Sequence, residues 1–162
     1  MKKVYLFLFV LCFLSACNFL KKEKPDNYND NKFITREVEF PSYKGRLAEK
    51  SQKIIDGVTK STFIVSYDEF NGAETIWHIE NKGKSKVTLY FTSRINKGKV
   101  KGVFINDKNL VANVFSEDIK DGLELGLGDG IYRIKLVGDK FSGKVNLTLI
   151  GEGDMKVYLT EK

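Results

Sequence analysis

The stretches GIYRIKLV, residues 130–137, and GKVNLTLI, residues 143–150, decide the fold class of this chain. In both stretches apolar residues alternate with polar ones. The apolar set is Tyr132, Ile134, Leu136, Val145, Leu147 and Leu149, and the polar set is Arg133, Lys135, Lys144, Asn146 and Thr148. A period of two residues is typical of a β-strand with two different faces. We therefore expect antiparallel strands whose apolar face packs on a core and whose polar face is wet.

Short runs of β-branched and aromatic residues, bounded by Gly, Asn or Asp, continue this pattern from Thr62 onwards. They predict strands over 62–70, 74–81, 86–95, 99–106, 109–116, 122–127, 130–137, 143–150 and 155–160. Turns are expected at Asn71-Gly72, Lys82-Gly83, Lys97-Gly98, Asp107-Lys108-Asn109, Asp121-Gly122 and Asp129-Gly130. The spacing predicts a single antiparallel β-sandwich over residues 33–162, with a jelly roll as one arrangement that fits.

The segment before these runs has a different pattern. Residues 33–40 predict a first strand. In residues 46–58, the apolar positions Leu47, Ile54, Ile55 and Val58 have the spacing of one helical face, and Gly57 could end a helix there. The predicted fold class is therefore mainly β, with one short N-terminal helix.

The chain begins with two lysines, Lys2 and Lys3, followed by an apolar segment over residues 4–14. This segment is shorter than the roughly 20 apolar residues that a membrane-spanning helix needs, but it suits a signal peptide. Small residues follow it. The run Leu14-Ser15-Ala16-Cys17 resembles the lipobox of bacterial lipoproteins.

This resemblance implies that residues 1–16 form a lipoprotein signal peptide and that Cys17 is the lipid attachment site, carrying a diacylglyceryl group. Two acyl chains would hold the protein on the membrane, because each buried methylene contributes about 0.8 kcal/mol. Residues 17–32 are polar and charged, which predicts a flexible tether. We expect an extracytoplasmic protein anchored to the cell membrane. The alternative is an ordinary secretory signal, which would leave Cys17 as a lone thiol.

Cleavage before Cys17 would also remove Cys12, so the folded domain would contain no cysteine. A disulfide and a thiolate metal site are thereby excluded. Of the formal net charge of +6, two units belong to Lys2 and Lys3, which leaves +4. Basic and acidic residues alternate along most of the chain, as on a solvated surface. An excess of lysine over arginine is typical of AT-rich genomes, as in many Gram-positive bacteria.

The single histidine, His78, lies next to the single tryptophan, Trp77. One histidine excludes a multi-histidine metal site, and no G-x-S-x-G nucleophile motif is present. The acid pairs Asp68-Glu69 and Glu117-Asp118 would point to opposite faces of a strand. We therefore predict no catalytic residue, no metal, no cofactor and no enzymatic activity, and place His78 in an exposed or half-buried position opposite Trp77. No nucleic-acid partner is expected, because the stretch KVKGVFIND lacks the second ring of an RNA-stacking strand.

Aromatic residues are the best candidates for a binding face: Trp77, Tyr67, Phe70 and Tyr90. An exposed ring can stack on a sugar or on an apolar side chain of a partner, whereas a ring on the inner face belongs to the core. These observations favour a binding module that contacts a cell-wall polymer or an envelope protein. The alternative is an envelope-acting hydrolase with an unrecognised site.

Overall fold

The computed structural model describes residues 27–39, 41–116 and 118–160. The predicted signal peptide, Cys17 and the first part of the predicted tether lie outside the described residues, as does Glu117. Among the described residues, no helix has the length and apolar character needed to cross a membrane.

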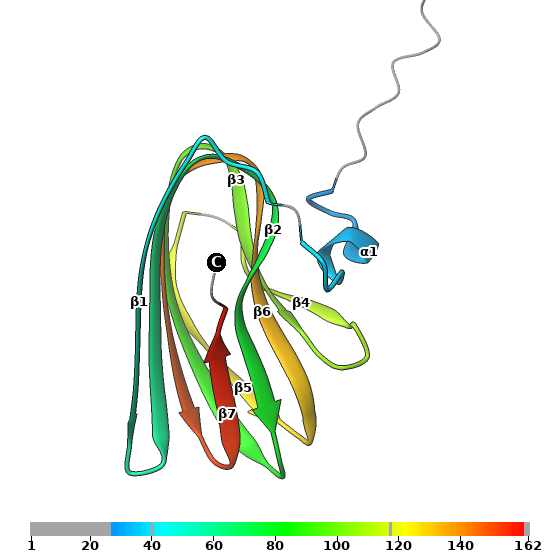
Figure 1. Ribbon diagram of the computed structural model, residues 1–162, viewed down its shortest axis with the longest axis vertical. Helices are drawn as coiled ribbons and strands as arrows, with labels where there is room; N and C mark the ends of the chain where they lie inside the picture. The colour runs from blue at the N-terminus through cyan, green and yellow to red at the C-terminus, as the bar shows by residue number, and fades with distance from the viewer. Residues whose placement is uncertain (1–26, 40, 117, 161–162) are drawn as a thin grey trace, which may run out of the picture.

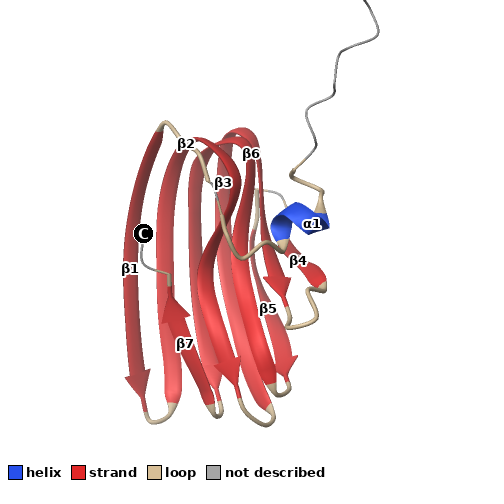
Figure 2. Ribbon diagram, turned by 45° about the vertical axis from the view of Figure 1, so that its right-hand side comes forward, coloured by secondary structure: helices blue, strands red, loops and turns tan. Residues whose placement is uncertain are grey.

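One short helix and seven strands make up the described chain (Figures 1 and 2). The helix is α1, Asn31–Ile34, and the strands are β1 Gly45–Ile55, β2 Val58–Asn81, β3 Ser85–Ile105, β4 Val111–Phe115, β5 Lys120–Leu127, β6 Gly130–Glu152 and β7 Met155–Leu159. The strand pairs described in this sheet are antiparallel. The predicted antiparallel, mainly β class with one short helix is therefore confirmed, although the helix lies at residues 31–34 and not at the predicted position.

The three longest strands, β2, β3 and β6, each bend near their middle, at the top of Figure 1. Their pairing slips in register at the bends, between Tyr67 and Gly72 in β2 and between Ile95 and Lys99 in β3. Such bulges bend a strand sharply. Each long strand therefore contributes to two halves of one sheet that folds over on itself.

The first half-sheet consists of β1, residues 58–67 of β2, residues 143–152 of β6, residues 85–95 of β3, and β5. The second consists of β7, residues 70–81 of β2, residues 130–141 of β6, residues 97–105 of β3, and β4. Their inner faces share one core, whose largest fully buried side chains include Phe63, Phe70, Trp77, Leu89, Leu136 and Phe141. The fold is thus the predicted sandwich, built from one bent sheet.

Some predicted turns are bends instead. Asn71-Gly72 lies within β2 and Lys97-Gly98 within β3, and the predicted strands over 130–137 and 143–150 are one continuous β6. Asp121-Gly122 lies inside β5. Gly72 and Gly98 have φ of 106° and 72°, and a bulge can require such a positive φ as well as a turn. The Asn-Gly and Lys-Gly pairs therefore mark bulges within strands here and not turns between strands. The turns at 82–83, 107–109 and 129–130 do separate strands, as predicted.

The predicted helix over 46–58 is wrong. These residues form β1 and the start of β2, joined by a two-residue turn at Asp56-Gly57. Leu47, Ile54 and Ile55 are 64–70% exposed and form no buried helical face. Continuous pairing with β2 outweighs the helical spacing, which is a weak signal in so short a window.

The predicted strand over 33–40 is also wrong, because α1 begins at Asn31 and the chain after it forms no described strand. Asp30 caps the helix through a hydrogen bond from the backbone N–H of Lys32, 2.9 Å long. Ile34 is fully buried against a small cluster on the outer face of the second half-sheet. Residues 27–39, which we call the N-terminal segment, therefore lie against this face, and the rest of the tether remains a prediction.

Candidate binding site

A cavity of about 670 Å³ opens at the second half-sheet. Strands β2, β6 and β7 supply part of its wall, and the N-terminal segment and the turn between β3 and β4 supply the rest. The lining residues are Glu37, His78, Glu80, Asn106, Asp107, Asn109, Ile131, Arg133 and Tyr158. We call this the His78 cavity. Its volume lies within the range of about 300–1,000 Å³ that small-molecule sites occupy.

Strand register brings three of these side chains into one row. His78 lies opposite Tyr158 of β7 on one side and opposite Arg133 of β6 on the other. Directly opposite residues in an antiparallel pair project from the same face of the sheet. The row therefore presents a phenol, an imidazole and a guanidinium to the same surface.

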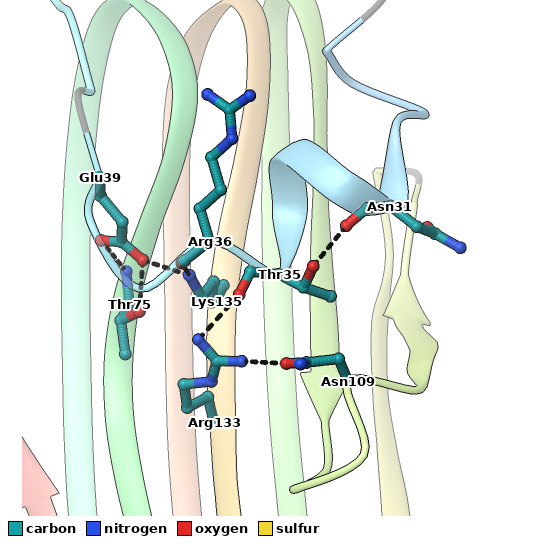
Figure 3. A network of polar contacts seen from close by, with 8 residues as sticks. All are labelled: Asn31, Thr35, Arg36, Glu39, Thr75, Asn109, Arg133 and Lys135. Atoms are coloured by element: carbon teal, nitrogen blue, oxygen red, sulfur yellow. Dashed lines mark hydrogen bonds and ion pairs between the residues drawn. The ribbon is translucent and has the colours of Figure 1, made fainter.

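Arg133 is held in place by two elements outside its own strand (Figure 3). One guanidinium nitrogen donates to the carbonyl oxygen of Thr35, 3.1 Å away, and the other donates to Oδ1 of Asn109, 2.7 Å away. Asn109 has φ of 58°, a left-handed conformation that asparagine tolerates better than most residues. Arg133 thus connects the end of α1 with the β3–β4 turn and fixes one wall of the cavity.

Beside this wall, Lys135 forms an ion pair with Glu39, whose carboxylate also accepts hydrogen bonds from Thr75 (Figure 3). Arg133 is 9% exposed and Lys135 is fully buried. The expectation that these two residues lie on a wet face is therefore wrong, because the N-terminal segment covers them. Their strand face was assigned correctly, since Ile134 and Leu136 point into the core.

His78 is exposed, and the adjacent Trp77 is fully buried, as predicted for neighbours on a strand. Partial burial lowers the pKa of His78 below its ordinary 6.5, and the positive charge of Arg133 lowers it further. Near neutral pH the imidazole is therefore mostly uncharged. In that form it offers one hydrogen-bond donor and one acceptor to a ligand.

The remaining lining groups are mostly polar. Glu37, Glu80 and Asp107 carry carboxylates, and Tyr158 donates from its hydroxyl to Oε2 of Glu80, 3.4 Å away. Ile131 adds an apolar side chain that is 55% exposed. Three carboxylates against one guanidinium give the cavity a negative formal charge. In the described part of the chain, no three His, Cys, Asp or Glu side chains are grouped so that they could hold a metal ion.

The structure corrects the binding face predicted from aromatic residues. Trp77 and Phe70 are fully buried and Tyr67 is 5% exposed, so these three rings belong to the core. Trp77 donates from Nε1 to Oγ of Ser61, 2.8 Å away in the first half-sheet. Tyr67 stacks on Phe70 and donates to Glu74, and burial raises its pKa, as does the charge of Glu74. All three rings point inward because the register shifts between Tyr67 and Trp77 change which positions of β2 face the core.

Tyr90 is the exception among the four, with 51% of its surface exposed. It lies on β3 in the first half-sheet, where it lines a second, smaller hollow of about 370 Å³. Thr92, Asn146 and Thr148 are among the residues that line this hollow. Tyr90 therefore does not share a face with the His78 cavity.

Sequence patterns did not identify Tyr158, Arg133, Asn109 and Glu37 as members of one site. The alternation of apolar and polar residues did assign Arg133 to the outer face of its strand. This was the one sequence signal that pointed to any of these four as a site residue. The grouping itself depends on pairing between β2, β6 and β7 and on the path of the N-terminal segment. Those are long-range features that a local pattern does not contain.

No protein-family model and no curated protein matches the chain. Among solved structures, it is similar to a family two carbohydrate esterase from Cellvibrio japonicus, with a TM-score of 0.39 and 11% identity over 73% of this chain and 37% of that one. It is also similar to the enzymatically active domain of tailspike protein 4 of bacteriophage CBA120, with a TM-score of 0.37 and 9% identity over 67% and 19% of the two chains. A third is a cupin-superfamily sugar phosphate isomerase from Silicibacter pomeroyi, with a TM-score of 0.33 and 9% identity over 73% and 78%. The chain spans less than half the length of the first two of these proteins.

Proposed function

We propose that this protein is a lipid-anchored binding module at the extracytoplasmic face of the cell membrane, and that the His78 cavity holds its ligand. The anchor is supported by the charged start, the short apolar segment and the lipobox ending at Cys17. The observation that carries the binding role is the cavity itself, in which five strands or segments place hydrogen-bonding groups around the exposed rings of His78 and Tyr158.

The chemistry of the cavity favours a hydroxyl-rich ligand without negative charge. A sugar ring has an apolar face that can pack on the ring of Tyr158, and hydroxyls that can bond to groups such as His78 and Asn109. The three carboxylates would repel phosphate-rich polymers. We therefore assign the ligand to the glycan part of the cell wall rather than to its anionic polymers. Binding without bond cleavage is the proposed activity.

A chain of residues 18–162 can test this role, because it keeps every described residue and both apolar clusters. Purified Gram-positive walls, before and after removal of their anionic polymers, should retain it equally. Tyr158→Ala should weaken retention by about tenfold, a loss of about 1.4 kcal/mol. Tyr43→Ala is the matched control, because both tyrosines are 45% exposed and Tyr43 lies outside the cavity lining.

Absence of retention by either wall preparation would contradict the proposed ligand, as would equal losses in the two variants. Release of soluble fragments from the walls would contradict a binding module and would favour the alternative, an envelope-acting hydrolase. The anchor is tested separately in cells. Labelled palmitate should enter the full chain and should not enter a Cys17→Ala variant, whereas labelling of both would contradict attachment at Cys17.

A further inference from the structure

Strand β1 is an unusually open edge of the first half-sheet. It pairs with β2 along its whole length without a register shift, and no described strand pairs with its other side. Figures 1 and 2 show it at the outer edge of the molecule. Natural proteins commonly protect such edges with proline, a bulge, a short strand or charged side chains, and of these β1 has only the charged side chains. β1 has 11 residues and contains no proline.

The two faces of β1 are fixed by contacts to the rest of the fold. Arg46 forms an ion pair with Glu74, and Gln52 donates from Nε2 to the carbonyl oxygen of Val157, 3.0 Å away in β7. Even-numbered residues therefore face the second half-sheet. The odd-numbered residues form the outer face, in the order Leu47, Glu49, Ser51, Lys53 and Ile55.

The residue types on this outer face follow the order apolar, acidic, small, basic, apolar, which is complementary to itself when the strand direction is reversed. Leu47 is 70% exposed and Ile55 is 64% exposed. If β1 pairs antiparallel with β1 of a second copy about a two-fold axis at Ser51, Leu47 lies opposite Ile55 and Glu49 lies opposite Lys53. Each contact occurs twice because of the symmetry. On the inner face, Ala48 lies opposite Ile54, which is 67% exposed in one copy alone.

The neighbouring symmetric registers lack this match. An axis at Glu49 or at Lys53 places that residue opposite its own copy, and directly opposed like charges are destabilising. An axis at Lys50 places Leu47 opposite Lys53. An axis at Gln52 places Glu49 opposite Ile55. Among these five registers, only the one centred on Ser51 places apolar residues opposite apolar residues and an acid opposite a base.

We propose that β1 is a self-association edge, through which two copies join their first half-sheets into one continuous antiparallel sheet centred on Ser51. Backbone hydrogen bonds supply the contact and the Glu49–Lys53 pairs set the register. No residue of β1 lines the His78 cavity, which opens at the second half-sheet. The association does not depend on the anchor or on the identity of the ligand.

Cross-linking tests the register directly. The chain of residues 18–162 contains no cysteine, so Ser51→Cys introduces its only thiol. Opposed residues at a two-fold axis are close enough for a disulfide, and mild oxidation should give a covalent dimer. Glu49→Cys and Lys53→Cys should each give no covalent dimer alone and should give one when the two variants are mixed. Absence of the Ser51→Cys dimer, or equal dimerisation by all three variants, would overturn the proposal.

Charge reversal tests the same pairing without a covalent bond. Sedimentation equilibrium should show a dimer for the unaltered chain, with circular dichroism confirming that each variant is folded. Lys53→Glu places two acids opposite each other and should weaken association by about tenfold. The double variant Glu49→Lys with Lys53→Glu restores opposite charges and should restore the dimer. A monomeric unaltered chain, or a double variant no tighter than the single one, would contradict the proposal.

Discussion

Lys135 and Glu39 form an ion pair in which Nζ lies 2.6 Å from Oε1, and solvent reaches only 1% and 6% of the two side chains. Lys135 is on β6, whereas Glu39 is on the N-terminal segment. The ammonium group also donates to the carbonyl oxygen of Arg36, 2.6 Å away. Buried charges are tolerated when they are paired and hydrogen-bonded. The pair therefore fixes the N-terminal segment over the sheet, beside the His78 cavity.

Removing one charge of this pair should be costly. Glu39→Gln removes the negative charge that lies 2.6 Å from the buried Lys135 ammonium, and we expect a loss of about 3 kcal/mol in the free energy of unfolding. Urea denaturation would measure it. Glu124→Gln is the control, because Glu124 pairs with Lys86 at 3.2 Å while both side chains are largely exposed. That change should cost less than about 0.5 kcal/mol, and equal losses would contradict the role of burial.

The same carboxylate predicts a dependence of stability on pH. Burial raises the pKa of Glu39, but hydrogen bonds from Lys135 and Thr75 outweigh it, so the pKa lies below 4.5. The folded state therefore favours the ionised form, and the stabilisation is complete above pH 4.5 and lost as pH falls through the lowered pKa. The stability difference between the unaltered chain and Glu39→Gln should be constant near neutral pH and should shrink in acid. A constant difference at all pH values would contradict this ionisation.

The fold class was predictable because strand alternation is a local property. Ile134 and Leu136 reach the core as their spacing indicates. The bends at Gly72 and Gly98 were not predictable, because a glycine with positive φ serves a hairpin and a bulge equally. Whether such a residue ends a strand or redirects it is decided by pairing with β6, far along the chain.

The site was less predictable than the fold for the same reason. The row of Tyr158, His78 and Arg133 exists because β2 lies between β6 and β7 at this point. Burial of Lys135 depends on the N-terminal segment, whose sequence is mostly polar and docks on the sheet through Tyr28, Phe33 and Ile34. The residues of β1 were assigned to a helix because one helical face and an exposed apolar edge can share a spacing.

Trp77 joins the two half-sheets through its hydrogen bond to Ser61, and both residues are fully buried. Ser61→Ala leaves the indole N–H without this acceptor, so we expect a loss of about 1–3 kcal/mol in the free energy of unfolding. Denaturation followed by tryptophan fluorescence reports on this contact specifically, because Trp77 is the only tryptophan. Ser66→Ala, on the outer face of the same strand, should change stability by no more than about 0.5 kcal/mol.

Two glycines with similar values of φ should differ in how well they tolerate replacement by alanine. Gly57 and Gly98 have φ of 78° and 72°, but a Cβ at Gly57 would meet nothing within 4 Å, whereas one at Gly98 would lie 2.2 Å from the carbonyl oxygen of Lys140. Gly57→Ala should cost about 1 kcal/mol through backbone strain alone. Gly98→Ala should cost at least about 3 kcal/mol, because the bend of β3 must shift. Similar melting temperatures for the two variants would contradict the close approach at this bend.

His78 can report on the electrostatics of the cavity, because it is the only histidine and its ring signals in an NMR titration are unambiguous. Burial and the charge of Arg133 lower its pKa, so the midpoint should lie below 6.5. The unfolded chain then binds this proton at higher pH than the folded one, and the contribution of His78 to stability declines as pH drops below 6.5. The charge of Glu37 opposes the shift, so Glu37→Gln should lower the midpoint further, whereas the distant Glu124→Gln should leave it unchanged. An unaltered or raised midpoint in Glu37→Gln would show that Glu37 does not face the imidazole, and the cavity would lose one of its walls.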